Sequence, residues 1–192
     1  MRIACVRTAA ELDSEATDLV VLPEGVDPAE ILAAASMHPE AAIVAAIREG
    51  AHSRAVIWHG SKNHVEYLKV ETDGRTVGTG NHEQSTVAHF QRFSVGVLIC
   101  MDVQNPQFSA RVVESLRASE NPIKVLCIPA DMGSYWFEGP ALSFPARYAG
   151  VYVALCNSTE THEARCRSFI ANCEGTKIVI QSNAEPIVAS AP

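Results

Sequence analysis

The sequence lacks the features that would place the protein in a membrane or on a nucleic acid. No apolar run among its 192 residues reaches the roughly 18 residues of a membrane-spanning helix. Its 15 Lys and Arg residues are scattered, and 22 Asp and Glu residues outnumber them to give a net charge of −7. Neither nucleic acid nor an anionic membrane surface is therefore an expected partner.

Several patterns of reactive residues are missing too. The six cysteines include no C-x-x-C pair, and the spacing of His162, Cys166 and Cys173 fits no common zinc site. No G-x-S-x-G sequence is present, which argues against a serine nucleophile on a strand-to-helix turn. We therefore expect neither a metal nor a disulfide framework. The N-terminal stretch lacks a long apolar core and is interpreted as a strand, not a signal peptide, so the predicted compartment is the cytoplasm.

What is present is the composition and periodicity of one globular domain, predicted to span residues 1–192. Hydrophobic residues make up 47% of the chain and charged residues 19%, which suits a sizeable core. Strands are predicted at 2–7, 18–24, 42–49, 54–60, 64–71, 85–91, 93–100, 123–130, 151–158, 167–173 and 176–182. Helices are predicted at 27–37, 106–120 and 139–150. Continuous apolar strands beside alternating ones indicate a layered α/β fold of mixed sheets.

Three reactive side chains stand at the ends of predicted strands. Glu24 ends DLVVLPE, Lys69 comes late in HVEYLKVE, and Cys100 ends FSVGVLIC. Alone, each has an ordinary interpretation, as a solvated loop acid, an exposed hairpin lysine and a buried core cysteine. Together, a thiol, a carboxylate and an ammonium are the groups that nucleophilic acyl transfer uses.

The motifs around these residues add a family resemblance. LPE, YLK and ICMD follow one another along the chain, and three downstream stretches continue the order, namely VLCIPADMGSYW, VYVALCN and CRSFIANCEGTKI. This ordered set resembles the nitrilase, or carbon–nitrogen hydrolase, superfamily. The family's usual K-x-H-L is KVET here, its Pro-Glu after the nucleophile is Pro106-Gln107, and several segments are short. The chain is therefore identified as a shortened and divergent member.

The resemblance implies a four-layer α-β-β-α sandwich of mixed sheets and a mechanism without a cofactor. Cys100 would be the nucleophile and Glu24 the general base and acid. Lys69 would stabilise the oxyanion together with the backbone N–H of Met101. Lys62 is the alternative lysine if the register of the hairpin is misjudged.

Further residues receive expectations from the same resemblance. Glu83 is a candidate second acid, with a solvated loop acid as the alternative, and Glu138 is a weaker candidate for the same role. Asp102 is expected to cap the turn or the following helix through its carboxylate. Contacts to the substrate are expected from the loop after strand 123–130, at Met132, Tyr135 and Trp136.

The predicted function is hydrolysis of a non-peptide C–N bond in a small amide or N-carbamoyl substrate. The sequence does not separate hydrolysis from acyl transfer to an amine. The alternative is a catalytically inactive relative that serves as a binding or regulatory protein. A homodimer is expected by analogy with the family.

Overall fold

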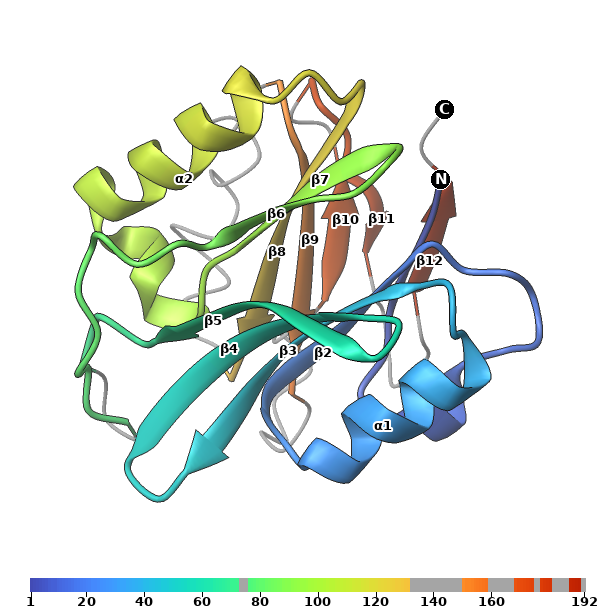
Figure 1. Ribbon diagram of the computed structural model, residues 1–192, viewed down its shortest axis with the longest axis horizontal. Coiled ribbons are helices and arrows are strands. Elements are labelled where there is room, and N and C mark those ends of the chain that lie inside the picture. Colours follow the sequence, from blue (N-terminus) through green and yellow to red (C-terminus); the bar gives the residue numbers. More distant parts are fainter. Residues whose placement is uncertain (73–75, 132–149, 159–167, 175–176, 181–186, 191–192) are drawn as a thin grey trace.

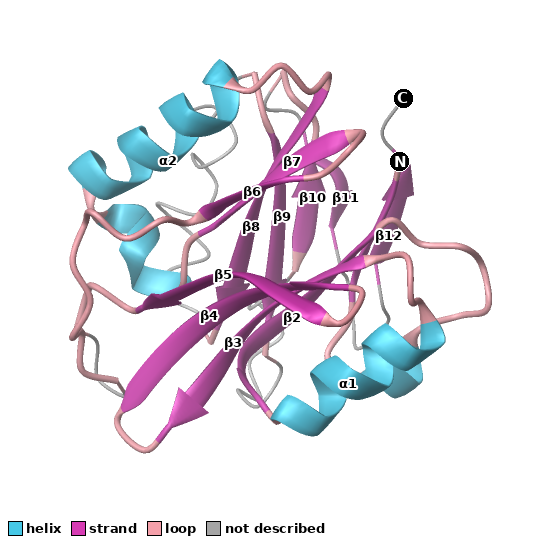
Figure 2. Cartoon of the chain, in the orientation of Figure 1, coloured by secondary structure: helices cyan, strands magenta, loops and turns pink. Residues whose placement is uncertain are grey.

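Two six-stranded sheets form the centre of the computed structural model, which describes residues 1–72, 76–131, 150–158, 168–174, 177–180 and 187–190 (Figures 1 and 2). The first sheet has the strand order β12 (Ile187–Ser190), β1 (Arg2–Cys5), β2 (Leu19–Val26), β3 (Ala42–Glu49), β4 (His52–His59) and β5 (Lys62–Leu68). The second has the order β11 (Lys177–Ile180), β10 (Phe169–Ala171), β9 (Tyr152–Asn157), β8 (Ile123–Ala130), β7 (Phe93–Val97) and β6 (Val87–His89).

The two sheets repeat one pairing scheme. Strands β1, β2 and β3 are parallel, as are β7, β8 and β9, while the flanking strands pair antiparallel. The parallel strands therefore end at one edge of each sheet, and in open α/β sheets this is the edge where ligands bind.

One helix covers the outer face of each sheet, so the layers run helix, sheet, sheet, helix (Figure 1). Helix α1 (Pro28–Met37) begins at Asp27, whose side chain accepts from the Ala29 N–H, and α2 (Pro106–Ala118) begins at Asn105, which caps the Phe108 N–H. Short 3₁₀ turns occur at Ala9–Glu11 and Cys100–Gln104. The predicted α-β-β-α sandwich is confirmed.

Burial explains why the sheets face each other. The inward side chains of the parallel strands form one apolar cluster between the sheets, which includes Val21, Val44, Val97, Leu126 and Ala154. The opposite faces of β2 and β3 form a second cluster under α1. Both faces of these strands are thus buried, as their continuous apolar sequence predicted.

The predicted elements agree with the structure at most positions and differ at informative ones. Strands 42–49 and 123–130 and the start of the helix at 106 are confirmed. The strand predicted at 93–100 ends at Val97, because the chain turns out of the sheet before Cys100. Strand β12 was not predicted, and the helix predicted at 139–150 lies almost entirely outside the described residues. No helix among the described residues is long and apolar enough to span a membrane.

Candidate active site

A buried ion pair lies at the centre of the candidate site. Lys69 Nζ is 2.9 Å from Glu24 Oε1, and the two side chains are 0% and 1% exposed. Glu24 lies in β2, where the register against β3 is irregular, and Gly25 follows it with a φ of +89°. Lys69 comes directly after the last residue of β5. The two residues that sequence analysis placed at strand ends, 45 positions apart, are therefore in contact.

Ser53 in β4 holds both members of this pair. Its hydroxyl donates to Glu24 Oε1 at 2.7 Å, and its carbonyl accepts from the Lys69 N–H at 2.9 Å. Its own side chain is buried, and the residue is 1% exposed. Sequence analysis missed Ser53, because it lies just before the strand predicted at 54–60 and a single serine there carries no signal of burial; the observed strand begins at His52.

The Cys100 backbone adopts an uncommon conformation. Cys100 opens the 3₁₀ turn that follows β7, and its φ is +43°, the one positive φ of a residue other than glycine among the described residues. A side chain at positive φ costs about 1–3 kcal/mol and is most often retained where function requires it. Cys100 is 3% exposed and is a thiol, not part of a disulfide.

Asp102 connects the Cys100 turn with the strand end that carries Lys69. Its carboxylate accepts from the Val70 N–H at 3.1 Å and from the Glu71 N–H at 2.7 Å. It also accepts from the Tyr67 hydroxyl at 3.1 Å, and that hydroxyl accepts from the Ile99 N–H. The expectation that Asp102 caps the following helix is wrong: Asn105 is the cap, and Asp102 bonds to residues more than 30 positions away.

Burial changes the acidity of several groups near the site. It raises the pKa of Asp102 to about 7, against the opposing effect of the Glu71 and Val70 N–H donors and of the Lys69 charge. Burial, followed by the Asp102 charge, raises the pKa of Tyr67 well above its usual value. Burial also raises the pKa of the Cys127 thiol, which disfavours its thiolate near neutral pH.

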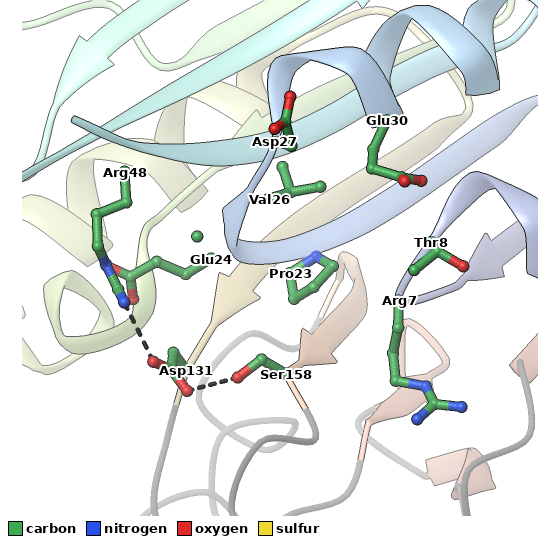
Figure 3. Close-up of a pocket in the computed structure, with 11 residues that line it drawn as sticks. Arg7, Thr8, Pro23, Glu24, Val26, Asp27, Glu30, Arg48, Asp131 and Ser158 are labelled. Atoms are coloured by element: carbon green, nitrogen blue, oxygen red, sulfur yellow. Dashed lines mark hydrogen bonds and ion pairs between the residues drawn. The ribbon is translucent and has the colours of Figure 1, made fainter.

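A cavity of about 340 Å³ opens beside Glu24 at the ends of the parallel strands (Figure 3). Arg48 and Asp131 line it and form an ion pair of 3.1 Å between the two sheets, and Ser158 donates to Asp131. The guanidinium carbon of Arg48 lies 3.6 Å from where a Cβ on Gly25 would stand, so Arg48 packs over the residue after Glu24. The cavity therefore lies at the edge where both sheets end.

The other predicted site residues are placed less centrally. Met101 is half-buried in the turn after Cys100, and Glu83 and Lys62 are exposed. The Glu83 N–H bonds to the Asn81 side chain. Met132, Tyr135, Trp136 and Glu138 lie outside the described residues, in the segment that follows Asp131. Among the residues that the structure describes, no group of three or more His, Cys, Asp or Glu side chains could hold a metal ion.

Comparisons with known proteins address the fold. No protein-family model and no curated protein matches the chain. Among solved structures, Nit3 of Saccharomyces cerevisiae, from branch 10 of the nitrilase superfamily, is 16% identical, with a TM-score of 0.74 over 98% of this chain and 89% of that one. The chain has the nitrilase fold.

Two further nitrilase-fold structures are similar to this chain. A CN-hydrolase superfamily protein from Xanthomonas campestris, with an arsenic adduct in its active site, is 15% identical, with a TM-score of 0.72 over 98% of this chain and 89% of its own. A glutamate-to-glutamine mutant of an amidase from Nesterenkonia sp. AN1 is 17% identical, with a TM-score of 0.70 over 98% of this chain and 88% of its own. That structure has the acetamide moiety of fluoroacetamide covalently added at its active-site cysteine. The similarity covers the fold of this chain almost from end to end.

Proposed function

We propose that the protein is an amidase-type carbon–nitrogen hydrolase that acts on a small amide or N-carbamoyl compound. The observation that carries the proposal is the Glu24–Lys69 ion pair, which is fully buried between two sheets. Two charges removed from water cost several kcal/mol each, and well-packed apolar residues are often no less stable in their place. A pair kept at this cost is better explained by chemistry than by stability, and the φ of +43° at Cys100 supports the same interpretation.

Acylation follows from the properties of the three groups. Glu24 takes the proton from the Cys100 thiol, and the thiolate attacks the carbonyl carbon of the amide. The Lys69 ammonium and the Met101 N–H stabilise the resulting oxyanion. As the C–N bond breaks, Glu24 gives its proton to the leaving nitrogen, so ammonia or an amine departs and a thioester remains on Cys100.

Hydrolysis repeats these steps with water. Glu24 takes a proton from water, the hydroxide attacks the thioester carbon, and Lys69 again stabilises the oxyanion. The C–S bond breaks and the proton on Glu24 returns to the cysteine, so one water and one amide give one carboxylic acid and one ammonia. We place substrate entry at the edge lined by Arg48 and Asp131, after which the chain continues to Met132, Tyr135 and Trp136.

Ammonia release from a panel of small amides and N-carbamoyl compounds tests the proposal. We expect turnover by the unmodified chain and by the control Cys173→Ala, and a loss of at least about 1,000-fold in Cys100→Ala. Fluoroacetamide, whose acetamide moiety added to the active-site cysteine of a mutant of the Nesterenkonia amidase, is expected to add to Cys100 in intact-protein mass spectra.

Two results would contradict the proposal. One is equal ammonia release by Cys100→Ala and the unmodified chain. The other is no release from any compound together with no adduct on Cys100, which would favour a catalytically inactive protein that binds or regulates. Products formed with an added amine separate hydrolysis from acyl transfer.

A further inference from the structure

Asp102 occupies an unusual position between the two sheets. It lies in the 3₁₀ turn two residues after Cys100, yet its carboxylate bonds to residues at the end of β5 in the opposite sheet. The residue is 0% exposed. A buried carboxylate is costly unless its oxygens are well satisfied, so its partners indicate what it is retained for.

Those partners enclose Lys69 on both sides. Tyr67 lies two residues before Lys69, and Val70 and Glu71 directly follow it. The Tyr67 hydroxyl and the two backbone N–H groups all donate to the carboxylate of Asp102. On the side of the nucleophile, Ile99 directly precedes Cys100 and donates to the same Tyr67 hydroxyl. Residues on both sides of the lysine and on both sides of the cysteine are thus joined in one hydrogen-bonded network.

The backbone N–H and carbonyl of Lys69 bond to residues outside the Cys100 turn. The Lys69 N–H bonds to Ser53 O in β4, and the Lys69 carbonyl accepts from the Thr79 and Gly80 N–H groups, each at 2.9 Å. None of these bonds reaches the turn that carries Cys100. The side chains of Asp102 and Tyr67 connect the two turns directly, and Asn105, at the end of the Cys100 turn, adds a bond by donating to Glu71 Oε1 at 2.7 Å.

We propose that Asp102 is a positioning residue for the reaction proposed above, on which this inference rests. Its carboxylate fixes the strand end that carries Lys69 at a set distance and orientation from the turn that carries Cys100. Lys69 must meet an oxyanion that forms only after Cys100 attacks, so an error of 1 Å between the two elements weakens the stabilisation. Asp102 therefore acts on the oxyanion step through Lys69, and not on the formation of the thiolate.

The variant Asp102→Asn tests this role with almost no change of volume. An amide has one oxygen where the carboxylate has two, so it cannot accept from the Glu71 N–H and from the Tyr67 hydroxyl with separate oxygens. The matched control is Asp18→Asn, because Asp18 also accepts a backbone N–H, from Arg2 at 2.7 Å, but lies directly before β2. Asp102→Glu is a second variant, which keeps the charge but displaces it by one methylene.

Two rates measured on the same preparations separate positioning from general structural damage. Alkylation of Cys100 by iodoacetamide forms no oxyanion and reports only the reactivity of the thiolate. Amide turnover requires the oxyanion as well. We expect Asp102→Asn to lower kcat by about 10- to 100-fold with KM and the alkylation rate of Cys100 within about threefold of the unmodified chain, and the Asp18→Asn control to change neither rate.

Each outcome has a distinct meaning. If kcat and the alkylation rate fall together, in proportion to the folded fraction seen by circular dichroism, Asp102 is merely structural and the inference is wrong while the proposed function stands. If kcat of Asp102→Asn and of Asp102→Glu equals that of the control, the inference is also wrong. If the unmodified chain shows neither turnover nor a reactive Cys100, the proposed function fails and the positioning role fails with it.

Discussion

At the scale of single residues, the structure departs most from ordinary protein chemistry at Glu24, Lys69 and Cys100. Two of them form a buried ion pair, and the third has a positive φ. Each feature lowers stability, since buried charges lose their hydration and a positive φ strains a side chain with a Cβ. The occurrence of these costly features in the three residues whose side chains suit acyl transfer is the reason for assigning them a joint role.

The stability of the ion pair gives a prediction about its two members. Lys69→Met leaves the Glu24 carboxylate buried without its cation, so we expect a loss of about 3–5 kcal/mol in the free energy of unfolding, measured in urea. The double variant Glu24→Gln with Lys69→Met removes both charges and is expected to recover most of that loss while remaining inactive. If the double variant is as unstable as Lys69→Met, the pair is needed for the fold and its retention does not indicate chemistry.

At the scale of secondary-structure elements, the close approach of α2 to β7 sets where the Cys100 turn lies. A Cβ on Gly96 in β7 would stand 2.9 Å from Leu116 Cδ1 and 3.0 Å from Val112 Cγ1, both in α2. These contacts are shorter than ordinary van der Waals distances, so the glycine allows helix and strand to pack directly. The helix begins only six residues after Cys100.

Gly96→Ala tests this packing. The added methyl group must displace α2 from the sheet, so we expect a loss of about 1–3 kcal/mol in the free energy of unfolding. Ser115→Ala on the exposed face of the same helix is the control and is expected to change stability by less than about 0.5 kcal/mol. Equal stability of Gly96→Ala and the control in thermal or urea unfolding would show that α2 does not pack as closely as described.

Among these elements, the sequence predicts those that depend on local signals and misses those that depend on distant contacts. Apolar runs identify β3 and β8 exactly, and Asn105-Pro106 identifies the start of α2, because these signals are local. Ser53 and the partners of Asp102 are set by contacts between distant segments, which periodicity does not record. For the same reason Asp102 was predicted to cap the turn or the following helix, the local roles that its sequence position favours.

At the scale of the whole molecule, the candidate site is assembled from both sheets. Glu24, Lys69 and Ser53 belong to the first sheet and its strand ends, and Cys100 and Asp102 to the turn that follows β7 in the second. The Arg48–Asp131 ion pair also connects the two sheets at this edge (Figure 3). The site therefore depends on the register of one sheet on the other, which the apolar cluster between them stabilises.

The pH dependence of unfolding is expected to report the buried carboxylate of Asp102. Its pKa is raised to about 7 in the folded chain, against about 3.9 for an ordinary aspartate, so between pH 4 and 7 the folded state holds a proton that the unfolded state lacks. The contribution of Asp102 to stability therefore decreases as pH rises through this window, by at most about 1.4 kcal/mol per pH unit, and is constant above it.

Urea unfolding of the unmodified chain and of Asp102→Asn at pH 5 to 8 measures how the contribution of Asp102 to stability changes with pH. Since Asn binds no proton, we expect the stability difference between the two proteins to be larger at pH 5 than at pH 8. A difference that is constant with pH, or that grows toward pH 8, would mean that Asp102 is ionised throughout and that the N–H donors of Val70 and Glu71 outweigh its burial.

The most direct measurement is the rate of alkylation of Cys100 by iodoacetamide as a function of pH, followed by peptide mass spectrometry. The account predicts that Cys100 reacts well below the ordinary thiol pKa of about 8.5, and that Glu24→Gln slows this reaction at pH 7 by about tenfold or more. Cys127, buried and with a raised pKa, serves as the internal reference and is expected not to react. A Cys100 that reacts no faster than Cys127, or that is indifferent to Glu24→Gln, would contradict the assignment of Cys100 as a nucleophile activated by Glu24.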